Sequence, residues 1–223
     1  MNWVLDNLDL LAGLTLEHAR LAVVPVLVGL LVSLPLGWLA HRVRWLRGIV
    51  LTVSSLLYTI PSLALFVLLP PLLGIPYLSD LNVTIALTIF AVALLVRSVA
   101  EALDSVPPEV RQSATAIGYA PAGRFFAVQL PLAGPVLLAG LRVAMVSTVS
   151  MVTVGAIIGV ESLGSLFTDG FQRRIMPEIV SGIVLTALLA IVFDAILVLV
   201  GRLLMPWQRA AGGRRSRRRA VAG

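Results

Sequence analysis

Five long apolar stretches limit what this chain can fold into. Each is about 20 residues or longer, which an α-helix needs to cross the hydrocarbon core of a bilayer. The stretches lie at 21–40, 49–73, 82–103, 133–159 and 179–204. Mean hydropathy is +1.01 and only 13% of the residues are charged, far below the share in soluble domains. The sequence therefore predicts an all-α membrane protein with five transmembrane helices.

The placement of arginine predicts the orientation of these helices. All 17 basic residues are arginine, and cytoplasmic loops of membrane proteins carry an excess of basic residues. The first loop has three arginines between positions 42 and 47, whereas the loop at 70–81 has none. The third loop contains Arg111 and Arg124, and the C-terminal tail is rich in arginine. We therefore expect the N-terminus outside, and the third loop and the C-terminus in the cytoplasm.

Residues 1–19 precede a transmembrane domain that we expect at 20–205. Four apolar side chains of this leader share one helical face: Val4, Leu5, Leu8 and Leu11. The pattern fits an amphipathic leader on the membrane surface, or equally a leader packed against the first span. The first charged residues, Asp6 and Asp9, have the wrong sign for the start of a signal peptide, so we expect none.

Residues 206–223 form a strongly basic tail, with five arginines between positions 214 and 219. Such a cluster can bind anionic lipid or nucleic acid. A disordered cytoplasmic tail that anchors the topology is the favoured interpretation, and we expect no nucleic-acid partner.

Composition excludes most catalytic chemistry. The chain has no cysteine, which removes disulfides and thiolate metal sites. It also lacks lysine, so a phosphate-binding loop of the form GxxxxGK[ST] cannot occur. His18 and His41 lie at opposite ends of the first span, and neither a metal-ligand spacing nor a GxSxG motif is present. We predict that the chain is not an enzyme and holds no metal or cofactor; any ATP must be bound by another chain.

Polar residues gather in the second and fourth apolar stretches. They are Ser54, Ser55, Tyr58, Thr59 and Ser62 in the second, and Ser147 and Thr148 in the fourth. Hydrogen bonds between helices, worth about 1 kcal/mol each, explain any one of them. The group around Pro61 equally fits a pathway for a polar solute.

Asp194 is the acidic residue deepest within the last stretch. An acid at such a depth is a functional candidate by default. A structural ion pair with Arg142, near the start of the fourth stretch, is the favoured alternative.

Residues 109–131 interrupt the apolar pattern between the third and fourth stretches. Two prolines precede this segment, and proline is favoured in the first turn of a helix. Gly118 lies where a left-handed residue would end that helix. Pro121 can open a second short helix over residues 122–129, closed before the final proline. The segment is too short and polar to span a membrane, which favours contact with another protein.

This segment resembles a loop of known membrane proteins. Membrane subunits of binding-protein-dependent ABC importers carry a cytoplasmic loop of the form E-A-A-x3-G-x9-I-x-L-P. Here Q-S-A begins at Gln112, Gly118 follows after three residues, and V-Q-L-P follows after nine more. The spacing is intact, and the departures are glutamine for glutamate, serine for alanine and valine for isoleucine.

The resemblance implies that the loop at 105–131 contains a coupling helix that docks into a groove of an ATPase subunit. The coupling residues that it implies are Gln112, Ser113, Ala114, Gly118, Arg124, Leu130 and Pro131. Gln112 cannot form a salt bridge made by the usual glutamate, whereas docking by shape and by the Gly118 turn is retained.

A second motif is similar to one in osmoprotectant permeases, which import glycine betaine, carnitine, choline or proline betaine. The segment YTIPSLAL at 58–65, followed by LLGIP at 72–76, resembles their TIPSLAL…LGIG pattern. The resemblance covers roughly residues 20–205. It implies a multi-pass subunit in a bacterial cytoplasmic membrane, paired with a second permease subunit. The other implied partners are an ATPase that binds ATP and Mg²⁺, and an extracytoplasmic solute-binding protein.

Two alternative functions stay open at this point. The coupling loop alone also fits a permease subunit of an amino-acid or methionine importer. The chain also fits a different class of protein, a self-sufficient secondary transporter or channel, in which the polar segment only connects two helices.

Overall fold

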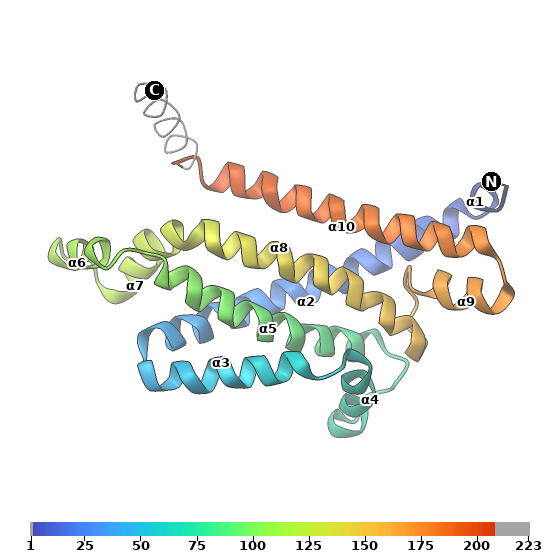
Figure 1. Cartoon of the computed structure of the whole chain (residues 1–223), viewed down its shortest axis with the longest axis horizontal. Helices are drawn as coiled ribbons and strands as arrows, with labels where there is room; N and C mark the ends of the chain where they lie inside the picture. The colour runs from blue at the N-terminus through green and yellow to red at the C-terminus, as the bar shows by residue number, and fades with distance from the viewer. Residues whose placement is uncertain (1, 208–223) are drawn as a thin grey trace, which may run out of the picture.

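The computed structural model describes residues 2–207, and within this range all regular secondary structure is helical, without strands. The all-α prediction is confirmed for this part. The long helices run alongside one another in alternating directions (Figure 1). Four helical stretches are long and apolar enough to cross a membrane: α2 (Leu8–Arg42), α5 (Asp80–Asp104), the stretch Pro121–Ile158 that contains α8 (Leu130–Gly155), and α10 (Met176–Leu204).

The second apolar stretch differs from the single span predicted at 49–73. It forms α3 (Arg44–Thr59) and α4 (Ser62–Leu73), which meet at an angle of 103°. Pro61 has no N–H to donate, and its ring would collide with the carbonyl one turn earlier. Ile60 before it adopts the extended conformation that a following proline favours, with φ −66° and ψ 127°. The break is therefore a bend and not a mild kink, and the pair counts as at most one further span.

Most of the N-terminal leader is the beginning of the first membrane helix. A short helix, α1 (Asn2–Asp6), is followed directly by α2, which starts at Leu8. Leu11 and Leu14 are buried in a cluster with Leu163 and Leu166, near α9 (Ser165–Arg173). Of the two interpretations of residues 1–19, these contacts favour the packed leader.

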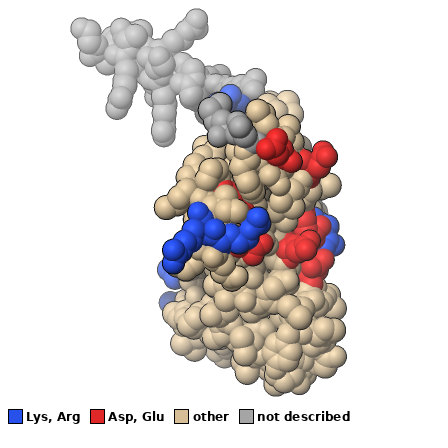
Figure 2. Space-filling view, turned by 90° about the vertical axis from the view of Figure 1, so that its right-hand side faces the viewer, with Lys and Arg blue, Asp and Glu red and all other residues tan. Residues whose placement is uncertain are grey.

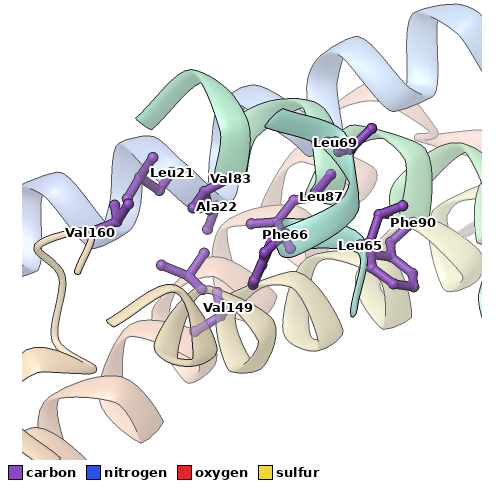
Figure 3. Packing of buried hydrophobic residues seen from close by; sticks show 12 residues of the cluster. Leu21, Ala22, Leu65, Phe66, Leu69, Val83, Leu87, Phe90, Val149 and Val160 are labelled. Atoms are coloured by element: carbon purple, nitrogen blue, oxygen red, sulfur yellow. The ribbon is translucent and has the colours of Figure 1, made fainter. Parts of the chain in front are cut away.

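The core lies where α2, α4, α5 and α8 meet. Figure 3 shows Phe66 of α4 among Leu87 of α5, Val149 of α8 and Ala22 of α2, all within one buried cluster. Asn82, also fully buried, donates from Nδ2 to the carbonyl of Phe66 at 2.8 Å. This hydrogen bond holds the start of α5 against the bent helix α4.

Helix α5 packs closely against its neighbours because glycines face it. A Cβ added at Gly37 of α2 would lie 2.5 Å from the Cβ of Val99, and one added at Gly29 would lie 2.6 Å from that of Ala91. In lipid, where no hydrophobic effect drives helices together, this close backbone approach maximises van der Waals contact.

The polar segment between α5 and α8 contains one separate helix and not two. Helix α6 (Pro108–Ala116) is followed by α7 (Pro121–Arg124), which continues through a π-helical turn, η1 (Phe125–Gln129), directly into α8. The prediction of a second helix closed before Pro131 is therefore wrong. The amide of Leu130 donates to the carbonyl of Phe125, five residues back. This wider turn lets the helix continue into the proline, which has no N–H of its own to donate.

The two ends of the helical bundle differ. Helices α6 and α7 lie at one end, with the last turns of α2 and α10, whereas the N-terminus and α9 lie at the other (Figure 1). Figure 2 views the α9 end, where acidic and basic side chains lie next to each other above an area without charged residues. The arginines predicted to form a basic tail, from Arg209 onward, lie outside the described residues.

We expect Gly37→Ala to destabilise the protein, because its new Cβ would overlap a β-branched side chain that cannot move away from the α5 backbone. Overpacking of this kind costs about 1–3 kcal/mol. Thermal unfolding in detergent measures the effect. Gly13→Ala is the matched control in the same helix, since nothing lies within 4 Å of its added Cβ. Equal melting temperatures for the two variants would contradict the proposed close packing.

Candidate functional site

The α6–α7 hairpin, residues 108–129, is built around a glycine that ends α6. Gly118 has φ +93°, a left-handed conformation that side chains disfavour. The amide of Tyr119 donates to the carbonyl of Ala114 at 3.1 Å, and that of Gly118 donates to Thr115 at 3.0 Å. These two bonds form a Schellman motif, which satisfies the last carbonyls of the helix. The predicted left-handed turn at Gly118 is confirmed.

The tip of the hairpin exposes apolar side chains. Ile117 is 76% exposed and Tyr119 is also exposed, although α6 itself is mostly polar, and Phe126 farther along in η1 is 66% exposed. Exposed apolar groups on a polar segment are typical of a surface that another protein covers. The sequence motif did not identify these residues; for Ile117 and Tyr119, the position next to the predicted glycine turn was the available signal.

The residues predicted for coupling take different places on this hairpin. Gln112 and Ser113 are exposed on α6, whereas Ala114 on its inner face is buried. Arg124 of α7 donates from Nη1 to the hydroxyl of Thr115, which joins the two arms of the hairpin. Leu130 packs against the core cluster that includes Val99, Leu103 and Phe125. Pro131 follows at the start of α8.

A hydrogen-bonded network ties the hairpin to the ends of α2, α3 and α5. Asp104, the last residue of α5, accepts from His41 of α2 at 2.6 Å and from Arg47 of α3 at 2.7 Å. Arg111 of α6 donates from Nη1 to Nε2 of the same histidine at 2.9 Å. Because a guanidinium group only donates, Nε2 must accept, and the histidine proton therefore lies on Nδ1, facing Asp104. The hairpin position is thus linked to α2, α3 and α5.

The predicted pathway residues are divided among α3, α4, α8 and α10. Helix α3 carries Ser54, Ser55, Tyr58 and Thr59, and it packs on α2 and α5. The ring of Tyr58 makes an edge contact with Phe90 of α5, with centroids 6.4 Å apart.

The remaining pathway candidates lie on other elements or bond locally. Ser62 begins α4, beyond the bend. Ser147 and Thr148 lie on α8, and the Thr148 hydroxyl donates to the carbonyl of Ala144 in its own helix at 2.8 Å. The Thr59 hydroxyl likewise donates to Leu56 at 2.7 Å. These bonds lie within single helices, so they are not the hydrogen bonds between helices that the sequence analysis gave as the alternative.

Asp194 is held in a two-point ion pair. Its carboxylate accepts from Nε and Nη2 of Arg142 at 2.6 and 2.7 Å, which connects α10 to α8. The favoured prediction of a structural pair is confirmed. The parallel geometry fixes both side chains, so the acid is already neutralised within the chain.

Comparison with known proteins places this geometry in a family. Residues 25–210 match the family described as binding-protein-dependent transport system inner membrane component. The chain belongs to this family. The osmoprotectant import permease protein OsmW of Salmonella typhimurium is 35% identical over 199 residues, which cover 88% of this permease and 93% of the relative. The choline transport system permease protein OpuBB of Bacillus subtilis is 31% identical over 86% of this permease and 87% of the relative.

Solved structures agree on the fold of the permease. A chain of the MetNI methionine ABC transporter superposes with a TM-score of 0.79 at 21% identity, covering 89% of this permease and 98% of that chain. A chain of an amino-acid ABC transporter superposes with a TM-score of 0.70 at 14% identity, covering 91% of this permease and 96% of that chain. The relatives are transport permeases and not enzymes. The expected resemblance to osmoprotectant permeases is confirmed.

We expect His41→Ala to loosen the α6–α7 hairpin, because it breaks the link between Arg111 and Asp104. At a partly exposed site this link is worth roughly 1 kcal/mol, or about fivefold in the rate of amide exchange. Hydrogen–deuterium exchange of residues 108–116 measures it. Arg97→Ala is the control, since it removes only an exposed ion pair with Glu101 on the same helix. Unchanged exchange in α6 of the His41 variant would contradict the link.

We expect Asp194→Leu to lower the amount of folded permease in the membrane, because it leaves the charge of Arg142 unpaired. The double variant Arg142→Leu/Asp194→Leu removes both charges and should restore the amount. Fluorescence-detected size-exclusion chromatography of detergent extracts measures both. If the amount of folded permease is as low for the double variant as for Asp194→Leu, the unpaired charge of Arg142 does not explain the loss.

Proposed function

We propose that this permease is the transmembrane subunit of an ABC importer for quaternary-ammonium osmoprotectants, such as glycine betaine, carnitine, choline and proline betaine. The observation that carries this proposal is the similarity to the osmoprotectant import permease OsmW over nearly the whole of both chains. The segment YTIPSLAL supports the same substrate class, and it forms the bend between α3 and α4.

The proposed topology has five spans, with α3 and α4 together as the bent second span. The end of the bundle with the α6–α7 hairpin faces the cytoplasm, because Arg42, Arg44, Arg111, Arg124 and Arg202 gather there. The N-terminus and α9 then lie outside a bacterial cytoplasmic membrane.

The hairpin is proposed to dock into an ATPase subunit, which binds ATP and Mg²⁺ and hydrolyses the nucleotide. The exposed side chains of Ile117, Tyr119 and Phe126 supply an apolar contact surface, and the Gly118 turn sets its shape. The network from Arg111 through His41 to Asp104 supports this proposal, because a movement of the hairpin would reach three membrane helices together.

Two further partners complete the proposed importer. Helix α10 is the least covered of the candidate spans, which leaves an apolar face for lipid and for a second permease subunit, identical or homologous. The outer end carries Glu161, Asp169, Arg173 and Arg174, with both signs of charge, as a surface for an extracytoplasmic solute-binding protein.

The solute pathway is proposed to run along the polar side chains of α3, with Tyr58 as its aromatic group. A quaternary ammonium ion has no N–H to donate, so it is recognised by aromatic faces. The Tyr58 ring is 44% exposed in the single chain. Because the Asp194 carboxylate is paired with Arg142, it offers the cation no free charge. In this proposal, the solute-binding protein and not the permease selects the transported solute tightly.

A methionine or amino-acid importer subunit is the second candidate, favoured by the structural match to the MetNI transporter. That match rests on 21% identity and concerns the fold, whereas the osmoprotectant relative is 35% identical. A self-sufficient secondary transporter is disfavoured by membership of a binding-protein-dependent family.

Uptake of labelled glycine betaine and choline tests the substrate class. The permease, with its ATPase and binding protein, is expressed in a bacterial strain lacking other osmolyte carriers. We expect ATP-dependent uptake that carnitine inhibits and methionine does not. Tyr58→Ala should slow this uptake without changing assembly. Inhibition by methionine alone would support the second candidate instead.

Gly118→Val tests the docking role of the hairpin. Positive φ, here +93°, is rare for a β-branched residue, because the left-handed conformation costs roughly 1–2 kcal/mol. The turn should therefore open, so that the ATPase no longer co-purifies while the permease stays in the membrane. Gly123→Val is the control, because its added Cβ meets only an ordinary contact with Tyr119 at 3.7 Å. Normal co-purification of the Gly118 variant would contradict docking through this turn.

A further inference from the structure

A polar cavity of about 340 Å³ lies between the last turn of α2 and the α6–α7 hairpin. Its walls include Arg42 of α2, Arg111 and Gln112 of α6, Arg124 of α7 and Gln129 of η1. The volume falls within the range of small-molecule sites, at its lower end. The cavity is therefore large enough for a charged headgroup and not only for single waters.

The cavity is strongly positive. Three guanidinium groups line it, and none of them pairs with a carboxylate within residues 2–207. No acidic residue is part of the lining, and the nearby carboxylate of Asp104 already binds His41 and Arg47. Gln112 stands where the importer motif has a glutamate, so this position adds no negative charge. Like charges around one cavity repel one another, and an anion between them would offset that repulsion.

One buried donor group on a residue that lines this cavity has no protein partner. Nε of Arg124 is buried and has no hydrogen-bond acceptor in the described chain. Gln129 also lines the cavity, and its side-chain amide makes no hydrogen bond to residues 2–207. Buried polar groups nearly always have partners, so the unpaired nitrogen of Arg124 needs an explanation.

The cavity lies beside the last turn of α2, a helix long and apolar enough to cross a membrane. Trp38 forms part of its wall, four residues before the end of α2, and tryptophan is enriched at the membrane–water interface. The guanidinium carbon of Arg42 lies over the Trp38 ring, 5.2 Å from its centroid. Stacking fixes the plane of the guanidinium group and leaves its N–H groups free at the edge.

We propose that this cavity binds a phosphate group, carried by an anionic phospholipid headgroup or present as inorganic phosphate. Phosphate oxygens match the paired donors of arginine. Donors from α2, α6, α7 and η1 surround the cavity, and a phosphate group has enough acceptor oxygens to reach several of them at once. The bound group joins the end of α2 to both arms of the hairpin, in addition to the contact between Arg111 and His41.

Direct binding to the purified full-length permease tests this proposal without any transport measurement. The probes are phosphatidylglycerol, inorganic phosphate, and diacylglycerol as a lipid without phosphate. Thermal shift and native mass spectrometry follow binding, and hydrogen exchange follows residues 108–129. We expect phosphate-bearing probes to bind and to slow exchange in the hairpin, and diacylglycerol to do neither. Binding of phosphatidylglycerol alone identifies a lipid site, and binding of both identifies a site for the phosphate group itself.

Three variants locate the site. Arg124→Gln should weaken binding about tenfold, the size expected for a lost hydrogen bond to a charged group. Gln112→Glu should weaken it similarly, since the added carboxylate competes for the same guanidinium groups, and this mild change guards against misfolding of the first variant. Arg44→Gln is the matched control, because this exposed arginine lies two residues from Arg42 but outside the cavity lining.

Several outcomes would overturn the proposal. Equal binding by wild type and by both cavity variants would exclude the cavity, and equal loss in the Arg44 variant would show non-specific attraction. Failure of both phosphate-bearing probes to bind would also reject it. If Arg124→Gln leaves phosphate binding intact but prevents co-purification of an ATPase, the cavity receives an acidic side chain of that protein instead.

Discussion

Close backbone packing around α5 is the constraint on which the rest of the structure depends. Gly29 and Gly37 let α2 approach α5 so closely that Ala91 and Val99 contact its backbone, and Gly140 of α8 does the same at Ser98. Because lipid provides no hydrophobic drive for helix association, van der Waals contact must supply much of the stability. The hairpin is attached to this frame, whereas α4 contributes Leu65, Phe66 and Leu69 to the buried cluster between α2, α5 and α8.

The end of α5 carries the link from that frame to the candidate site. Asp104 is its last residue, and it brings together His41, Arg47 and, through the histidine, Arg111. The hairpin is therefore positioned by charge-assisted hydrogen bonds to the ends of α2, α3 and α5, in addition to the helical continuation of α7 into α8. In the proposed importer, the part of the permease that meets the ATPase is linked to the ends of α2, α3 and α5.

Features with a local sequence signal were predicted well. Proline and glycine placement identified α6 and the left-handed Gly118, apolar length identified the long helices, and the depth of Asp194 led to its pairing with Arg142. Features that depend on packing were missed, namely the 103° bend and the π-helical entry into α8. A proline alone does not show whether a helix kinks or breaks. His41 was also missed, because its partner Asp104 lies 63 residues away.

The continuous helix Pro121–Ile158 has a mechanical consequence. It runs without a break from the hairpin to the opposite end of the bundle, and the Arg142–Asp194 pair attaches it to α10 part-way along. At 1.5 Å per residue, this attachment lies about 32 Å from one end and about 24 Å from the other. A sideways push on the hairpin would therefore be carried into a continuous helix that is tied to α10 part-way along its length and packed against α5 at Gly140.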